Sequence, residues 1–239
     1  MRSDSARTQK GEQTRALIID KALELFSERG YEQTTMRAIA DRSGLALGNA
    51  YYYFQSKAQL ILAFYDRTLD GHRAAVVAAL ERERDLKTRL LEVMRAKIAT
   101  IEPFHEFAGA LFKTAADPRS PLNPFSRESE PVRRESIAMF AQVVEGSNVN
   151  VPKDLKAELP YLLWLYHMGL VLFWIHDSSR GRARTHSLVD RTVELVVRLI
   201  KLASHPLMRP LRKAALGLVT ELKDIGSTEG ITPGSRQSR

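Results

Sequence analysis

Cysteine is missing from the 239-residue sequence, which excludes disulfide bonds, thiolate metal ligands and thiol nucleophiles. The six histidines show no HExxH or other metal-ligand spacing. A glycine-rich phosphate loop and a G-x-S-x-G nucleophile motif are also missing. We therefore predict no catalytic residues, no bound metal and no cofactor.

Long apolar runs are scarce as well. The longest, residues 161–175, is shorter than the roughly 20 residues that cross a bilayer, and it contains His167. Residues 1–15 are polar and lack the apolar stretch of a secretory signal. We expect a cytoplasmic protein with no membrane partner.

The net charge of +8 is compatible with a polyanionic partner, but the excess is spread along the chain. Residues 1–57 carry 9 Lys/Arg against 7 Asp/Glu, and residues 204–239 carry 6 against 3. Charge alone therefore does not separate a nucleic-acid-binding protein from an ordinary basic soluble one.

Helical periodicity is what the sequence has in abundance. Apolar residues spaced by three and four predict a helix over 14–29, which Gly30 ends. Thr34 and Thr35 are N-cap candidates for a short second helix, and Ser43-Gly44 ends that helix. Four helix starts within about 60 residues leave no room for strands. Beyond residue 60, further helices are predicted over 57–81, 85–101, 104–115, 130–145, 154–176, 185–203 and 209–223.

We therefore predict an all-α fold of about nine to ten helices. The short second helix, a tight turn at Ser43-Gly44-Leu45 and a third helix predicted over 47–54 would form a helix-turn-helix, a geometry that places its second helix in the DNA major groove. The expected divisions are a disordered basic arm over 1–12, the helix-turn-helix domain over 13–60, a longer helical domain over 61–223, and a disordered tail over 224–239.

Residues 48–57 read GNAYYYFQSK and place three tyrosines in a row. Successive helical residues differ by about 100° around the axis, so the three rings cannot all enter one core. Measured from Phe54, Ala50 and Tyr51 are expected to face inward, and Asn49 and Tyr52 outward. Amide and phenol groups on an outward face offer hydrogen bonds to base edges and phosphates. Packing against neighbouring helices is the alternative for any single tyrosine.

Residues 35–60 read TMRAIADRSGLALGNAYYYFQSKAQL, and with the helix before them they resemble the TetR family of transcriptional regulators. The resemblance combines residue type and spacing at more than ten positions. It implies base reading by Arg37, Leu47, Gly48, Asn49 and Tyr52. It also implies phosphate contacts by Thr35, Tyr51, Tyr53 and Lys57. Ala46 stands where the family often has a serine N-cap, a change worth around 1 kcal/mol of cap stabilisation.

The residues support most of these roles. An outward Arg37 can make a bidentate contact with guanine. Lys57 lies in the first turn of its helix, where the macrodipole disfavours a cation, so a compensating anion such as phosphate is expected. Leu47 lies one heptad before Phe54, so it could either enter the core or contact a thymine methyl group.

The resemblance further implies that an N-terminal three-helix, helix-turn-helix DNA-binding domain precedes a C-terminal helical ligand-binding and dimerisation domain. This regulatory and dimerisation domain would span 61–223. Segments 161–176 and 185–203 are apolar enough to be covered on two sides, which predicts a four-helix homodimer interface. A monomer core built from the same helices is the alternative. The ligand-site candidates are Met94, Ile98, Phe104, Phe107, Phe112, Met139, Trp164 and His167. The same residues could be plain core, and their composition favours an uncharged or mostly apolar ligand.

Together these features predict a ligand-responsive repressor. It would bind a palindromic double-stranded DNA operator as a dimer and be released by an unknown small, mostly apolar effector. A helical ligand carrier or adaptor without DNA binding and, with less support, an enzyme are the alternatives.

Overall fold

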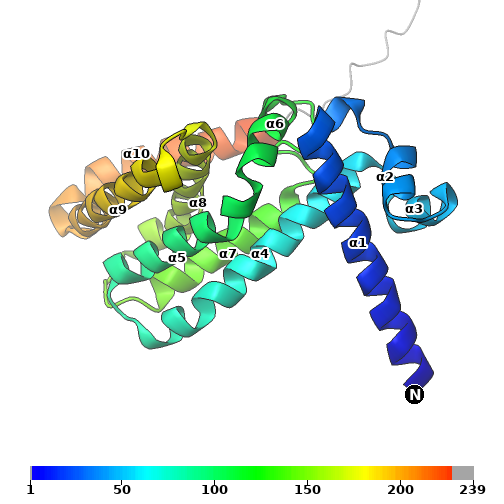
Figure 1. Cartoon of the computed structure of the whole chain (residues 1–239). Helices are drawn as coiled ribbons and strands as arrows, with labels where there is room; N and C mark the ends of the chain where they lie inside the picture. Colours follow the sequence, from blue (N-terminus) through cyan, green and yellow to red (C-terminus); the bar gives the residue numbers. More distant parts are fainter. Residues whose placement is uncertain (1, 228–239) are drawn as a thin grey trace, which may run out of the picture.

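The computed structural model describes residues 2–227, and within this range the elements are helices joined by turns, with no β-strand (Figure 1). The α-helices are α1 (Arg2–Gln33), α2 (Met36–Arg42), α3 (Leu47–Tyr53), α4 (Lys57–Arg82), α5 (Leu86–Ile101), α6 (His105–Ala116), α7 (Glu130–Glu145), α8 (Lys153–His176), α9 (Ala183–Ser204) and α10 (Arg209–Ser227). Short 3-10 turns are η1 (Glu102–Phe104), η2 (Arg180–Arg182) and η3 (Pro206–Met208). The all-α prediction is confirmed.

The two ends of the chain differ from the sequence-based expectation. The helix α1 begins at Arg2, so residues 2–12 are helical where a disordered arm was expected. This segment contains no proline, and a polar composition is compatible with continuing a helix that its downstream residues already anchor. Similarly, α10 includes residues 224–227 of the expected tail, whereas residues 228–239 lie outside the described range.

Glycine and threonine mark the breaks around the first two helices. Gly30 adopts a φ of 82°, which interrupts α1 at the predicted stop. The buried Thr34 hydroxyl donates to the Gly30 carbonyl at 2.8 Å, and Thr35 caps α2 by accepting a hydrogen bond from the Ala38 amide at 3.2 Å. Gly44, with a φ of 68°, ends the turn after α2. The sequence therefore specifies these turns through residues with suitable backbone and side-chain chemistry.

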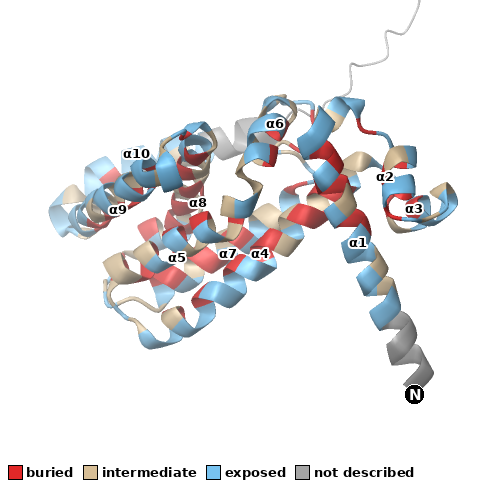
Figure 2. Ribbon diagram, in the orientation of Figure 1, coloured by how far each residue is buried: buried red, intermediate tan, exposed pale blue. Residues whose placement is uncertain are grey.

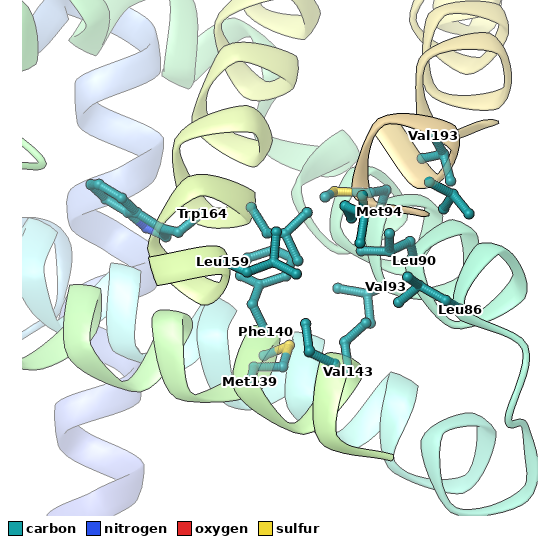
Figure 3. Close-up of a cluster of buried hydrophobic side chains, with 14 of the residues drawn as sticks. Leu86, Leu90, Val93, Met94, Met139, Phe140, Val143, Leu159, Trp164 and Val193 are labelled. Atoms are coloured by element: carbon teal, nitrogen blue, oxygen red, sulfur yellow. The ribbon is translucent and has the colours of Figure 1, made fainter. Parts of the chain in front are cut away.

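Two large groups of buried apolar side chains hold the molecule together (Figure 2). The first, here the N-terminal core, joins α1, α2 and α3 to Phe64 of α4 and Phe107 of α6. The second, here the bundle core, lies among α4, α5, α7, α8 and α9 (Figure 3). Helix α4 contributes side chains to both cores. The predicted domain boundary after residue 60 therefore lies within a continuous helix that joins the two cores.

Helix α8 is long and apolar enough, by length and composition, to cross a membrane. From the sequence, the apolar run over residues 161–175 was expected to be too short to cross a membrane. In the structure α8 packs against α6, α7, α9 and α10, and buries Leu163, Trp164, Leu170 and Trp174. Its apolar character is thus partly accounted for by its place in the helical bundle.

Arg89 is a buried guanidinium that binds only backbone carbonyls among its described partners. It donates to the Leu80 and Glu83 carbonyls at the end of α4, at 2.5 and 2.6 Å. It also donates to the Gln142 and Val143 carbonyls near the end of α7, at 2.6 and 2.9 Å. Four charge-assisted hydrogen bonds compensate its desolvation and tie three helices together at one end of the bundle.

The approach of Gly146 to this guanidinium gives a stability test. A Cβ atom at position 146 would lie 2.3 Å from Arg89 Nη2, so Gly146→Ala must displace the side chain from its carbonyl partners. We expect a loss of about 1–3 kcal/mol in the free energy of unfolding, measured by urea denaturation. Gly109→Ala is the control, because no atom lies within 4 Å of a Cβ there, and it should leave stability unchanged or slightly raised. Equal stability of Gly146→Ala and wild type would contradict the role given to Arg89.

Candidate nucleic-acid interface

Helices α2 and α3 and the turn between them form a helix-turn-helix. Ile39 and Ala40 of α2 and Ala50 of α3 are fully buried in the N-terminal core, which fixes the inward faces of both helices. The turn is closed by the Leu45 amide, which donates to the Ala40 carbonyl at 2.9 Å. The arrangement leaves the opposite face of α3 open to solvent.

An ion pair fixes α2 against α1. The Arg42 guanidinium makes two hydrogen bonds to the Glu28 carboxylate, at 2.8 and 2.9 Å. The hydrogen bonds from Arg42 hold the pKa of Glu28 below its usual value. Because both groups are well exposed, the contribution of this pair to stability is small, and the buried apolar contacts between α1 and α2 hold the two helices together.

The outward face of α3 carries the side chains that the sequence predicted for base reading. Gly48 and Asn49 are exposed, and Tyr52 is 83% exposed, a large fraction for an aromatic ring. Arg37 is exposed on α2, as is Thr35 at its N-cap. An exposed amide, phenol and guanidinium on a helix-turn-helix can donate and accept hydrogen bonds at base edges.

The expected inward position of Tyr51 is wrong. Tyr51 is 46% exposed, whereas Tyr53 is partly buried against the N-terminal core and packs edge-on to the Tyr52 ring at 5.2 Å. The helix ends at Tyr53, and Phe54 has extended backbone with a φ of −143°. Helical angles measured from Phe54 therefore do not apply to the residues before it.

Leu47 is partly buried and packs against the N-terminal core. Of the two roles considered for Leu47, the structure supports packing in the core, although part of the side chain still faces solvent. Its contact with a thymine methyl group stays a prediction. Ala46 is the N-cap of α3 and, as expected from its methyl side chain, makes no capping hydrogen bond.

Lys57 has partners within the protein. Its Nζ donates to the Tyr31 carbonyl at 2.5 Å and the Glu32 carbonyl at 3.3 Å, and lies 4.3 Å from the centre of the Tyr31 ring. Burial lowers the pKa of Lys57. Carbonyls at the C-terminal end of α1 thus supply the negative partner that was assigned to phosphate. Tyr31 and Glu32 lie 26 and 25 positions before Lys57, so no local sequence pattern could predict this contact.

The ligand-site candidates do not converge on one pocket. Met94, Met139 and Trp164 belong to the bundle core, whereas Phe104 and Phe107 pack with the N-terminal core. Ile98 lies in a third, smaller cluster with Ile101 and Trp174, and Phe112 packs edge-on to His176 at 5.3 Å. Phe104 and Phe107 instead line an open cleft between α1 and the start of α6, with Asp20, Glu24 and Arg182 on its walls.

Sequence reasoning singled out His167 but missed two residues beside it. His167 is 4% exposed, its ring lies 6.3 Å from the buried His72 ring, and the Lys97 charge acts on both imidazoles. A signal was available: Lys97 follows Leu90 by seven residues and Val93 by four, so it lies at the edge of the buried stripe of α5, where it is partly exposed. His72 similarly lies between Leu69 and Val76 on the buried stripe of α4.

Helices α8, α9 and α10 present a second exposed surface, here the apolar face. Its large exposed side chains are Leu172, Phe173, Leu195, Leu199, Leu202, Leu207, Leu211 and Leu218. Five of the eight lie in the segments 161–176 and 185–203 that were predicted to dimerise. Large exposed apolar side chains gathered on neighbouring elements are unfavourable in water and typical of a surface that another protein covers.

These features define a helix-turn-helix regulator with a separate helical domain. Residues 18–64 match the model described as bacterial regulatory proteins, tetR family. Residues 89–216 match the model described as the tetracyclin repressor-like C-terminal domain. The chain belongs to the TetR family of transcriptional regulators.

The chain is similar to several curated regulators over part of its length. It is 33% identical over 96 residues to the transcriptional activator FasR of Mycolicibacterium smegmatis, covering 40% of this chain and 41% of FasR. It is 42% identical over 53 residues to the repressor KstR of Mycobacterium tuberculosis, covering 22% of this chain and 24% of KstR. The aligned parts thus span less than two thirds of these relatives.

Solved structures agree with the fold. A tetR-family regulator from Streptomyces coelicolor superposes with a TM-score of 0.61 at 21% identity, covering 90% of this chain and 98% of that one. FadR from Bacillus subtilis in complex with stearoyl-CoA superposes with a TM-score of 0.60 at 16% identity, covering 76% and 96%. At these identities the similarity shows the fold alone.

Asn49 and Lys57 allow base reading to be separated from positioning. Asn49→Ala should relax the preference at particular base pairs by about 1–3 kcal/mol, because it removes hydrogen bonds to a base edge. Lys57→Ala should weaken binding to all DNA sequences equally. It should also lower the melting temperature of the protein, because the carbonyls at the end of α1 lose their hydrogen-bond donor. Fluorescence anisotropy with a duplex selected from random DNA, and single-base variants of it, measures both.

Lys113→Ala, which removes an exposed lysine on α6, is the control for net charge. It should change neither the base preference nor the melting temperature. A uniform loss of affinity from Asn49→Ala across the duplex panel would refute the base-reading role.

Proposed function

We propose that this protein is a cytoplasmic, dimeric transcriptional repressor that binds a palindromic operator and is released by a small-molecule effector. The observation that carries the proposal is the exposed face formed by Arg37, Asn49 and Tyr52 on a helix-turn-helix. A face built to be solvated would be rich in lysine and glutamate, whereas this one offers hydrogen-bonding groups suited to base edges.

A dimer is needed for reading a palindrome. Two recognition helices must reach successive major grooves about 34–36 Å apart, or a multiple of that spacing. The apolar face on α8, α9 and α10 offers a self-complementary surface for a second copy related by a two-fold axis.

Two structures of similar fold hold molecules of the kinds that this function requires. FadR from Bacillus subtilis is in complex with stearoyl-CoA, and AibR is in complex with isovaleryl coenzyme A and operator DNA. The AibR structure superposes with a TM-score of 0.52 at 19% identity. These two complexes support a regulator that binds DNA and an effector.

The packing suggests how an effector would act on DNA binding. Phe107 of α6 contacts Phe26 of α1 and Phe64 of α4, with ring centres 6.0 and 5.5 Å apart. A shift of α6 or α4 in the bundle would therefore tilt α1 and the recognition helix with it. A change of a few ångströms in the spacing of the two recognition helices prevents both from docking.

We propose no catalytic activity, because the named relatives are regulators and the sequence lacks catalytic motifs. A helical ligand carrier is the alternative. Electrophoretic mobility shift with the DNA flanking the gene, at stated salt concentration, separates the two functions, since a carrier would bind no duplex with sequence preference. Loss of the shift on adding an effector, with equal weakening of effector binding by DNA, would establish the regulatory coupling.

Leu199 tests the dimer. Leu199→Glu places a carboxylate in the middle of the apolar face, where a covered charge would lack a partner, so the dimer should dissociate. Analytical ultracentrifugation should show monomers, and operator affinity should fall at least tenfold. The control is Val77→Glu on α4, which is similarly exposed (49% against 53%) but lies outside the apolar face. A folded Leu199→Glu variant that remains dimeric would place the interface elsewhere.

A further inference from the structure

Three nitrogen-bearing side chains of the helical bundle form what is here called the basic cluster. His72 of α4 and His167 of α8 are buried, whereas Lys97 of α5 is partly exposed and its charge acts on both imidazoles. The His72 and His167 rings are nearly parallel, at 18°, with centres 6.3 Å apart. Phe140 of α7 packs against His167 at 5.6 Å. Residues from four helices thus meet around this cluster, away from the helix-turn-helix.

His167 is the unusual member. It is 4% exposed, and neither ring nitrogen has a hydrogen-bond partner among the described residues. Burying a polar ring without partners costs free energy, and most buried polar groups in proteins are paired. His72 is different, because its Nε2 lies 2.8 Å from the Val93 carbonyl and donates to it. His167 therefore retains hydrogen-bonding capacity that the fold itself does not use.

The cluster is basic and lacks an opposing carboxylate. Burial lowers the pKa of Lys97 to about 8, so its ammonium remains largely charged at neutral pH. Burial and the Lys97 charge lower the pKa of His72 to about 4 and that of His167 well below its usual value, so both rings are neutral. Among the described residues, no aspartate or glutamate contributes to the pKa of any of the three. The Lys97 charge and the unpaired His167 ring thus lack an anionic partner among the described residues.

We propose that the basic cluster binds the carboxylate of an effector whose remaining body is apolar. In this arrangement the Lys97 ammonium pairs with the carboxylate, and the neutral His167 ring donates one N–H to the same group. Phe140 and the neighbouring bundle core, which includes Met94 and Met139, contact the apolar body. Methionine side chains are flexible enough to repack around a ligand of irregular shape. This deepens the proposed function by naming the effector class. It keeps the mostly apolar body that the sequence favoured and adds a charged head group.

The chemistry of the head group is tested by matched probes. Decanoate, methyl decanoate and decanoyl-CoA share one chain but differ in the head group, since only the first has a carboxylate on the chain. Isothermal titration calorimetry with the full-length protein should show decanoate binding at least tenfold more tightly than the other two. Hexanoate and tetradecanoate extend the panel, so that chain length is not mistaken for head-group preference.

Two variants assign the binding to the cluster. Lys97→Met should weaken decanoate binding at least tenfold and leave the affinity for methyl decanoate unchanged. Lys97→Arg, which keeps the positive charge, should bind decanoate much more tightly than Lys97→Met. His167→Phe, which keeps the ring volume, should weaken decanoate several-fold. The matched control is Lys87→Met on the same helix, which removes a lysine paired with Glu194 at 3.2 Å on the surface and should leave acid binding unchanged. Circular dichroism melts establish that each variant is folded.

Three results would overturn the proposal: no binding by any acid in the panel, equal binding of decanoate and its methyl ester, or tighter binding of decanoyl-CoA. Unchanged decanoate affinity in folded Lys97→Met would also overturn it. DNA binding is measured separately by mobility shift, so the two conclusions fail independently. Acid binding without any sequence-preferring DNA binding would refute the repressor and leave the acid site standing.

Discussion

The aromatic contact between Phe64, Phe107 and Phe26 is the interaction on which the arrangement of the molecule depends. Phe64 lies on the helix that follows the recognition helix, Phe107 on a helix of the regulatory half, and Phe26 on the first helix of the DNA-binding half. Their rings meet at 5.5 and 6.0 Å in one buried cluster. Aromatic pairs of this kind contribute about 0.5–1.5 kcal/mol each beyond the burial of their surface. The packing of these rings therefore joins a helix of the regulatory half directly to α1.

The recognition surface depends on the same packing in a different way. Ala50 is buried on the inward face of α3, so Asn49 and Tyr52 of the same helix point outward, and no polar partner within the fold is needed to hold them there. Lys57 and Arg42 act beside this surface. Lys57 binds the carbonyls that end α1, and Arg42 binds Glu28, so each ties a neighbouring helix to α1. The exposed face is therefore presented by a support that is fixed by burial and by charge.

Buried basic groups in the bundle fall into two kinds that differ in how their hydrogen bonds are satisfied. Arg89 has four carbonyl partners and joins the ends of α4 and α7, which is a structural role. His167 has none among the described residues, and Lys97 beside it faces no carboxylate that shifts its pKa. In a low-dielectric interior, complete pairing stabilises a fold, whereas unused hydrogen-bonding capacity is characteristic of binding sites.

The sequence alone determined the helices, their order and the helix-turn-helix, because periodicity, caps and glycine turns are local signals. The α7 range of 130–145 and the starts of α2, α3 and α4 agree with the structure, as does the stop at Gly30. Tertiary structure decided which side chains meet. The extended backbone at Phe54 exposed Tyr51, the end of α1 took up Lys57, and the candidate ligand residues separated into different clusters. Contacts such as Lys57 with Glu32, 25 positions apart, or His72 with His167, 95 positions apart, depend on how helices cross. Helix crossing is set by the packing of whole helix faces, which no local pattern encodes.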